Sequence, residues 1–574
     1  MRRHYDGFWL PATVRDKIIT PERGFEVLHF KGGEWIPEPD DDTVTVRWPR
    51  LELGDWQQVL GLLERNRQNT PTGHPSDRLP RAMQRMRGIW SDRSNSLRQD
   101  VLGALETCTG HSIGMLDISL SLLEMMSMED LQRASACQFP NAVKTQFVAL
   151  DGLPGKIRFF VDGWWSNQAT QARLQLEGYR QQTWRLQRRA TDRVLGYAAG
   201  NVPGTGLLIV LLALAATAGQ SGLPPMILIR NSRREPLFTP LVLAALESFD
   251  PGLLDTTLVT LWDHADTALQ EYLLAQADLV VAAASDETIE DISQTIKRVS
   301  TSSRPIRFHG HGHKVSFSTV GRECLKVGKT TPLNDVPLVD AVALLASLDV
   351  ALWNQQGCLS SRVHFLEQGN NQEYHSPEVY CHAVVRGLRL LNRLIPKGSP
   401  RKRQIHNLFD KYQAVAAGGP VKVLSDYDDD FVVVLDRRPL TAAQFGELVN
   451  DCQGRTVAII PVDDVMEIPE HYLRYVHRAH LQSMSVALGN PDEPGIDPRL
   501  LRYAEALGAV GVTGIRTVGR GAFPQLAYSW DGLIPLDLTV KRQKGYFTAL
   551  EFDEPWMQIH ETHRLVRQAI EDRV

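Results

Sequence analysis

The middle of the chain alternates strand-like and helix-like segments, and this alternation constrains the fold more than any other feature of the sequence. Short apolar runs occupy 194–197, 226–229, 257–262 and 279–283, and the helical patterns that follow them begin near 205 or cover 237–247, 264–276 and 286–298. Strands that alternate with helices of this length form a parallel sheet covered on both faces. Because ligands of such sheets bind at the carboxyl ends of the strands, the glycine turn at 200–204 is a candidate site.

Flanking segments complete the expected organisation. A strand at 43–48 and a loop at 65–78 precede two or three helices within 97–131, and a hairpin at 145–161 is followed by a polar helix over 166–189. A second α/β region begins after 310, with helices at 335–347 and 376–395 and strands at 431–435, 457–460 and 514–518. The chain is expected to end in a helix.

Composition narrows the class of protein. The 574 residues carry a net charge of −5, which offers no electrostatic argument for nucleic acid or an anionic membrane as partner. The most apolar stretch, 207–218, is shorter than the roughly 20 residues of a membrane span, and no signal peptide is predicted. The six cysteines form no CxxC pair, so we expect a cytoplasmic protein with free cysteines.

Two polar segments follow predicted strands. There is no GxGxxG, but Gly200–Gly204 opens a helix, where backbone N–H groups can face a phosphate or an oxyanion; the alternative is an ordinary turn. Arg230, Arg233 and Arg234 flank Asn231 and Ser232 in a segment suited to a phosphomonoester, or simply solvated. If a dinucleotide binds here, these arginines favour the one with a 2′-phosphate.

Histidine and cysteine supply the remaining candidate chemistry. His309, His311 and His313 would share one face of an extended strand, where they could bind zinc with a fourth ligand, act as a general base, or form a histidine-rich edge by chance. Cys358 follows Gly357 in a small, polar turn, which favours an accessible thiol over the buried structural role expected of the other five cysteines.

Taken in order, several segments resemble the LuxC-type fatty acyl-CoA reductases, a branch of the aldehyde dehydrogenase superfamily. The residues that carry the resemblance cover roughly 100–545 and are Gly200-Asn201-Val202-Pro203, Ser232 with Glu235-Pro236, Ala277-Asp278 through Ser285-Asp286, Gly312-His313-Lys314-Val315-Ser316-Phe317, Gln355-Gln356-Gly357-Cys358-Leu359-Ser360, and Val512-Thr513 through Asp531-Gly532. Two departures are Trp530 in place of the family's usual histidine before Asp531, and about 95 unmatched N-terminal residues.

The resemblance implies a role for each matching residue. Cys358 corresponds to the acyl-accepting nucleophile, Asn201 to the oxyanion-hole asparagine, and His313 to the general base, with His311 as its neighbouring alternative. The expected cofactor is NADPH, and no metal is expected. The residues implied to bind the cofactor are Gly200, Pro203, Arg230, Ser232, Arg233, Arg234 and Ser285.

The expected fold is therefore α/β and aldehyde dehydrogenase-like, with a parallel-sheet cofactor-binding domain, an α/β catalytic domain and a small β-hairpin extension. The expected boundaries are 1–95 for an N-terminal extension of unknown role, 96–310 for the NADPH-binding domain with a hairpin at 141–165 for oligomerisation, 311–515 for the catalytic domain, and 516–574 for a segment packing back on the core.

The expected activity is reduction of an acyl thioester, carried by coenzyme A or an acyl carrier protein, to an aldehyde. The expected assembly is a homo-oligomer, with an acyl-transferring enzyme as a possible partner. Two alternatives remain open: a metal-dependent hydrolase that uses the three histidines, and a non-catalytic subunit that presents substrate to another enzyme.

Overall fold

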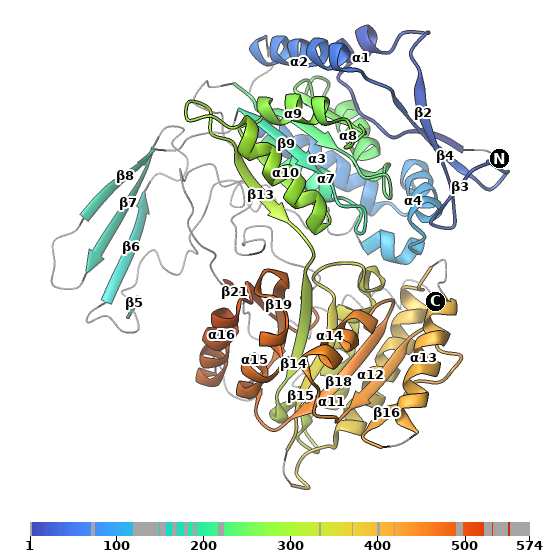
Figure 1. The fold of residues 1–574 in the computed structure, drawn as a ribbon, viewed down its shortest axis with the longest axis vertical. Coiled ribbons are helices and arrows are strands. Elements are labelled where there is room, and N and C mark those ends of the chain that lie inside the picture. Colours follow the sequence, from blue (N-terminus) through green and yellow to red (C-terminus); the bar gives the residue numbers. More distant parts are fainter. Residues whose placement is uncertain are drawn as a thin grey trace.

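Two α/β halves lie one above the other, joined where β13 (Arg307–His311) leads into β14 (Val315–Val320) (Figure 1). We call residues 3–311 the amino-terminal half and residues 315–551 the carboxyl-terminal half. The computed structural model describes residues 3–69, 75–118, 148–149, 156–162, 169–176, 182–187, 192–215, 223–331, 335–369, 371–398, 402–417, 419–489, 497–521, 531 and 549–551.

A five-stranded parallel sheet forms the centre of the amino-terminal half. Its strand order is β11 (Thr257–Thr260), β10 (Met226–Arg230), β9 (Arg193–Tyr197), β12 (Leu279–Ala283) and β13. Along β10, Ile227 and Ile229 enter one hydrophobic core while Met226 and Leu228 enter another. Helices α7 (Thr205–Ala215) and α8 (Phe238–Phe249) supply the first core, and α9 (Thr267–Gln276) and α10 (Asp286–Val299) the second. The predicted parallel sheet with two covered faces is confirmed.

An eight-stranded sheet forms the carboxyl-terminal half. Its order is β16 (Val421–Val423), β17 (Val432–Asp436), β18 (Thr456–Val462), β15 (Ser361–Glu367), β14, β19 (Leu481–Ala487), β20 (Gly514–Thr517) and β21 (Ala549–Glu551). Every neighbouring pair is parallel except β16–β17. Helices α11 (Leu338–Ala351) and α12 (Pro377–Leu394) pack on one face, and α13 (Lys402–Ala416), α14 (Ala442–Asp451) and α16 (Pro498–Val510) on the other.

One segment of the described chain, Leu338–Gln355, is long and apolar enough to cross a membrane by length and composition. Its apolar window is 89% buried inside the protein, which is the position of a core helix. The expected C-terminal helix lies outside the described residues.

The N-terminal extension is part of the amino-terminal half. It has a four-stranded sheet, β1 (Arg3–Asp6), β4 (Val44–Pro49), β2 (Phe25–Lys31) and β3 (Glu34–Ile36), with helices α1 (Ala12–Ile18), α2 (Leu53–Gln68) and α3 (Pro75–Ser91). Helix α4 (Ser96–Thr109) follows the extension. The loop expected over 65–78 is wrong at both ends, since α2 extends to Gln68 and α3 begins at Pro75. Both helices are longer than expected because each buries one face against the protein. Arg67, near the end of α2, and Leu79, near the start of α3, are both buried.

The helix expected over 166–189 is also wrong. This region forms β7 (Ala169–Leu176) and β8 (Gln182–Gln187), which continue an antiparallel sheet from β5 (Val148–Ala149) and β6 (Lys156–Asp162) (Figure 1). The Gln- and Arg-rich composition favours a helix, but Ala172, Leu174 and Leu176 recur with the two-residue period of a strand. Pairing with β6 decides between the two.

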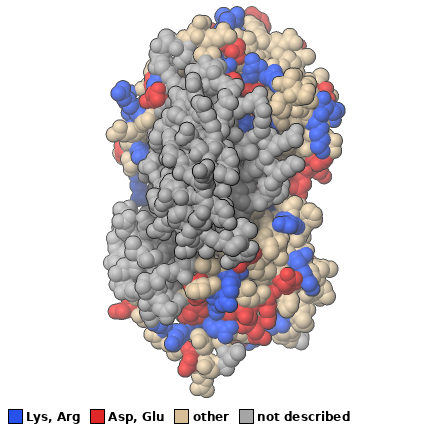
Figure 2. All heavy atoms as spheres, turned by 90° about the vertical axis from the view of Figure 1, so that its left-hand side faces the viewer, with Lys and Arg blue, Asp and Glu red and all other residues tan. Residues whose placement is uncertain are grey.

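Basic and acidic side chains are interspersed over the coloured part of the face shown in Figure 2, in keeping with the small net charge.

Candidate active site

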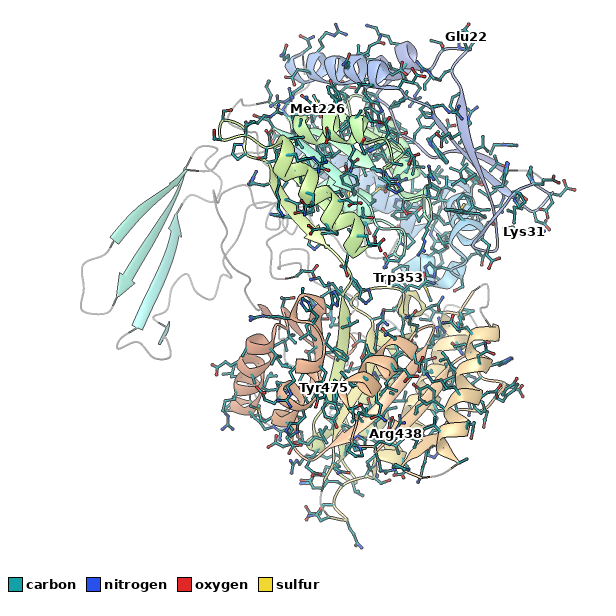
Figure 3. The ribbon with its side chains drawn as sticks, in the orientation of Figure 1. Glu22, Lys31, Met226, Trp353, Arg438 and Tyr475 are labelled. Atoms are coloured by element: carbon teal, nitrogen blue, oxygen red, sulfur yellow. The ribbon has the colours of Figure 1, made fainter. Side chains whose placement is uncertain are left out.

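Residues from both halves meet where the turn after β9 approaches the turn before β15. Asn201, in the first turn, donates a hydrogen bond from its side-chain amide to the carbonyl of Gln356, at 2.6 Å. Val202 lies against Gly357, because a Cβ added to that glycine would be 3.6 Å from a Val202 methyl carbon. Trp353, just before this turn, lies at the junction of the two halves (Figure 3). The structure therefore brings together Asn201 and Cys358, which the sequence places 157 positions apart.

Cys358 is the exposed cysteine of the described chain, whereas Cys108, Cys324, Cys381 and Cys452 are buried, as predicted. Although its side chain reaches solvent, the protein packed around it raises the pKa of the thiol to about 11, first by desolvation and then through the negative charge of Asp531. Hydrogen bonds from the Gln482 side chain and from the backbone N–H groups of Cys358 and Leu359 act in the opposite direction. The thiol thus needs a base before it can act as a nucleophile.

Three consecutive residues before this turn adopt the left-handed conformation that non-glycine residues rarely take. The φ angles are 55° at Trp353, 50° at Asn354 and 58° at Gln355. The buried side-chain amide of Gln355 stabilises this conformation. Its Nε2 donates to the carbonyls of Ser361 and Thr456, and its Oε1 accepts from the Thr456 N–H at 2.8 Å. Such strain persists where the surroundings over-determine it, and it clusters at functional sites.

The structure gives His311 a buried carboxylate partner. Its Nδ1 lies 2.7 Å from Oδ2 of Asp531, and Oδ1 of Asp531 accepts from Gln482 Nε2 at 2.5 Å. Burial opposes ionisation of Asp531, but the hydrogen bond and charge of His311, with Lys314 and Gln482, lower the pKa of this carboxyl. Gln482 therefore connects Asp531 to Cys358, since it hydrogen-bonds to both.

The other two histidines of the motif do not join this pair. His313 lies beyond the end of β13, exposed, with its backbone N–H donating to Asp286 and its ring 5.5 Å from that of His480. Partial desolvation and the charges of Arg362 and His480 lower the pKa of His313. His309 is buried. No cluster of three or more His, Cys, Asp or Glu able to hold a metal ion occurs among the described residues, so no observation favours the zinc alternative.

The residues proposed for cofactor binding lie at the carboxyl ends of the five-stranded sheet. Gly200, in the turn after β9, packs against the segment after β10, where an added Cβ would be 2.1 Å from Ser232 Oγ. Pro203 is buried in the same turn. Arg230, at the end of β10, donates to the carbonyl of Trp262 at 3.0 Å. Ser285 caps the start of α10.

Arg233 is the residue of this group best suited to bind a phosphate. Its Nε is buried without a hydrogen-bond partner, and its guanidinium lies 3.9 Å from Glu26 of the N-terminal extension. Arg234 is exposed, and its backbone N–H donates to Ser232 Oγ. These residues fit a phosphate-bearing dinucleotide, because they combine a glycine turn, a helix start and a guanidinium group whose Nε has no hydrogen-bond partner.

Sequence reasoning missed Gln482 and the partnership of Asp531 with His311. Gln482 gives no local signal, because it sits in an ordinary strand, β19. Asp531 was visible only as a residue of the family motif that lacks its usual preceding histidine.

The structure resembles enzymes of the aldehyde dehydrogenase superfamily. Aldehyde dehydrogenase 21 from Physcomitrella patens aligns with a TM-score of 0.55 and 11% identity, over 92% of each chain. The Δ-pyrroline-5-carboxylate dehydrogenase of Mycobacterium tuberculosis aligns with a TM-score of 0.54 and 11% identity, over 96% of this chain and 91% of that one. The fold is thus aldehyde dehydrogenase-like, an α/β fold as predicted.

The family follows from the sequence model that matches residues 173–542, described as acyl-CoA reductase (LuxC). That match covers more than half of the chain, so the chain belongs to the acyl-CoA reductase (LuxC) family. The family and fold support an oxidoreductase acting on acyl or aldehyde groups. No curated protein matches the chain by sequence.

Proposed function

We propose that this protein reduces an acyl thioester, of coenzyme A or an acyl carrier protein, to an aldehyde with NADPH. The observation that carries the proposal is the exposed Cys358, two residues after the carbonyl that accepts from the Asn201 amide and connected through Gln482 to the His311–Asp531 pair. Family membership supports the acyl substrate. NADPH rather than NADH is supported by the arginines at the end of β10 and by the buried, unpartnered Nε of Arg233.

His311 serves as the general base in this proposal. Asp531 accepts from Nδ1–H, which leaves Nε2 as the basic nitrogen of the ring, and the buried carboxylate stabilises the imidazolium when it forms. His311 takes the thiol proton, and the Cys358 thiolate attacks the acyl carbonyl. The role of His313 remains a prediction; its own contacts are with Asp286 and His480.

Two donors face the developing oxyanion. The Asn201 amide has two N–H groups and uses one on the carbonyl of Gln356, so the second is directed to the acyl oxygen together with the backbone N–H of Cys358. The thiol carrier departs with the proton held by His311, and an acyl-Cys358 thioester remains. When bound, NADPH supplies the hydride for reduction of this thioester. The tetrahedral alkoxide on Cys358 would then expel Cys358 as a thiolate and release the aldehyde.

Intact-protein mass spectrometry after incubation with a panel of acyl thioesters, without NADPH, tests the first half of this reaction. We expect the wild type to gain one acyl mass and Cys358→Ala to gain none. Cys324→Ala, which alters a buried cysteine, is the matched control and should still load. Loading and aldehyde formation by Cys358→Ala would overturn the assignment.

A further inference from the structure

His111 contacts both turns of the candidate site, although it lies outside the residues that match the family model. It follows α4 and is only 2% exposed. Its imidazole hydrogen-bonds to the backbone of Asn201, and its ring meets that of Trp353 edge-on, with centroids 5.7 Å apart. Trp353 lies at the junction of the two halves in Figure 3. One side chain thus connects the turn of the oxyanion asparagine with the turn that leads to Cys358.

The direction of the Asn201 hydrogen bond follows from the ionisation of the ring. Burial and the charge of Arg455 lower the pKa of His111 to about 4, so the imidazole is neutral at physiological pH. The Asn201 bond favours the charged form, as a ring N–H donating to a backbone carbonyl does. Nδ1 is buried without a partner, which makes Nε2 the donor.

Close packing leaves the His111 segment little room to shift. A Cβ added to Gly398 would lie 2.1 Å from the carbonyl oxygen of Gly110 and 2.8 Å from the backbone nitrogen of Ser112. The neighbouring Lys397 carbonyl accepts a hydrogen bond from Asn354, inside the left-handed turn, at 2.8 Å. The segment that carries His111 is therefore packed against a second support of the same turn.

We propose that His111 is a positioning residue that holds the main chain of Asn201 at a set distance from the Cys358 turn, so that the two oxyanion donors converge on one acyl oxygen. This role rests on the proposed function. His111 exchanges no proton in the reaction, because it stays neutral. Its effect is on the acylation step, whose rate depends on sub-ångström placement of the donors.

Single-turnover acylation without NADPH tests this role by intact-protein mass spectrometry. His111→Phe keeps a ring beside Trp353 but removes the donor, and we expect its acylation rate constant at saturating thioester to fall roughly tenfold to a hundredfold. The thioester concentration at half-saturation should change less than about threefold, because donors to the oxyanion act mainly in the transition state. His111→Gln places an amide N–H near the position of Nε2, so its rate should stay within about threefold of the wild type.

The matched control is His406→Phe, which should acylate normally. His406 lies in α13, and its ring stacks on that of Tyr427. Normal acylation by His111→Phe, or a rate in His111→Gln as low as in His111→Phe, would overturn the positioning role. If His111→Phe does not fold, His111→Asn replaces it. The shorter Asn side chain does not reach the position of Nε2, so the acylation rate should be low in His111→Asn and near the wild-type value in His111→Gln. A wild type that takes no acyl group from any thioester would instead overturn the proposed function itself, and this role with it.

Discussion

Asp531 acts on Cys358 and His311 in opposite ways. Its negative charge helps to raise the pKa of the Cys358 thiol, while its carboxylate orients the imidazole that would take the thiol proton. A resting thiol with a pKa of about 11 is almost fully protonated at neutral pH, so it is protected from alkylation and oxidation until substrate and base act together.

Asp531→Asn separates these two effects. Loss of the negative charge should lower the pKa of the Cys358 thiol, so alkylation by iodoacetamide at pH 8 should become faster, by roughly tenfold for each pH unit of the shift. Acylation by a thioester should become slower by roughly a hundredfold or more, because His311 loses its carboxylate partner. Both rates are measured by mass spectrometry from pH 6 to 11; the wild-type alkylation rate should rise with pH until the thiol titrates near 11. A slower alkylation in the variant would contradict the assigned charge effect.

Substitution of Arg233 tests whether the protein prefers NADPH to NADH. Arg233→Ala should weaken NADPH binding by roughly tenfold to a hundredfold, the loss of about one charge-assisted hydrogen bond, while NADH binding stays nearly the same. Quenching of protein fluorescence measures both dissociation constants. Arg298→Ala, which alters an exposed arginine paired with Glu271, is the control. An equal loss for NADPH and NADH would show that Arg233 does not recognise the 2′-phosphate.

At the scale of elements, the left-handed turn at 353–355 depends on the Gln355 side-chain amide, which hydrogen-bonds to backbone groups at the starts of β15 and β18. The Gln355 side chain bridges the first residues of the paired strands β15 and β18 through hydrogen bonds to Ser361 and Thr456. The turn can therefore depart from α11 and present Cys358 without leaving the ends of these strands unpaired.

Gln355→Leu should destabilise the carboxyl-terminal half by roughly 3 kcal/mol, because it buries backbone groups of Ser361 and Thr456 without partners. Differential scanning calorimetry should show a lower melting temperature, and acylation should slow in the same variant. The adjacent Gln356→Leu is the control, since that side chain is exposed and only its carbonyl is used. Equal melting temperatures for the two variants would show that the turn does not need the buried amide.

At the scale of the whole molecule, the N-terminal extension completes the five-stranded sheet. Trp9 pairs with Val259 of the edge strand β11 through two backbone hydrogen bonds, of 2.7 and 3.0 Å, and its side chain enters the core that contains α7 and α8. The extension thus covers an edge that would otherwise be open to pairing with other chains.

Two tryptophans of the extension differ in burial and therefore allow a paired test of how firmly it is attached. Trp9→Ala should cost about 3–5 kcal/mol, because it leaves a cavity in the core of the amino-terminal half. Trp35→Ala, in β3, should change stability by less than about 0.5 kcal/mol, since that side chain is 52% exposed. Thermal unfolding and limited proteolysis of the purified variants measure the difference. If the two variants melted alike, the extension would be only loosely attached.

The parallel sheets were predictable because their evidence is local and repeated. Each apolar run in the amino-terminal half is followed by a helical pattern, and the strands and helices lie within a few residues of the expected bounds. Segment 166–189 was not predictable in this way, because its polar composition fits a helix as well as a strand and only pairing with β6 decides. The accessible Cys358 was indicated by its small, polar neighbours.

The sequence by itself determined the α/β class, the family resemblance and the accessibility of Cys358, since these depend on spacing and composition within short segments. Only the tertiary structure decided which histidine has a carboxylate partner, because His311 and Asp531 are 220 positions apart and nothing between them signals the contact. It likewise decided that Gln482 and His111 border the site. Such contacts arise when helices and sheets pack, and packing of the two halves, not local propensity, determines which side chains face one another there.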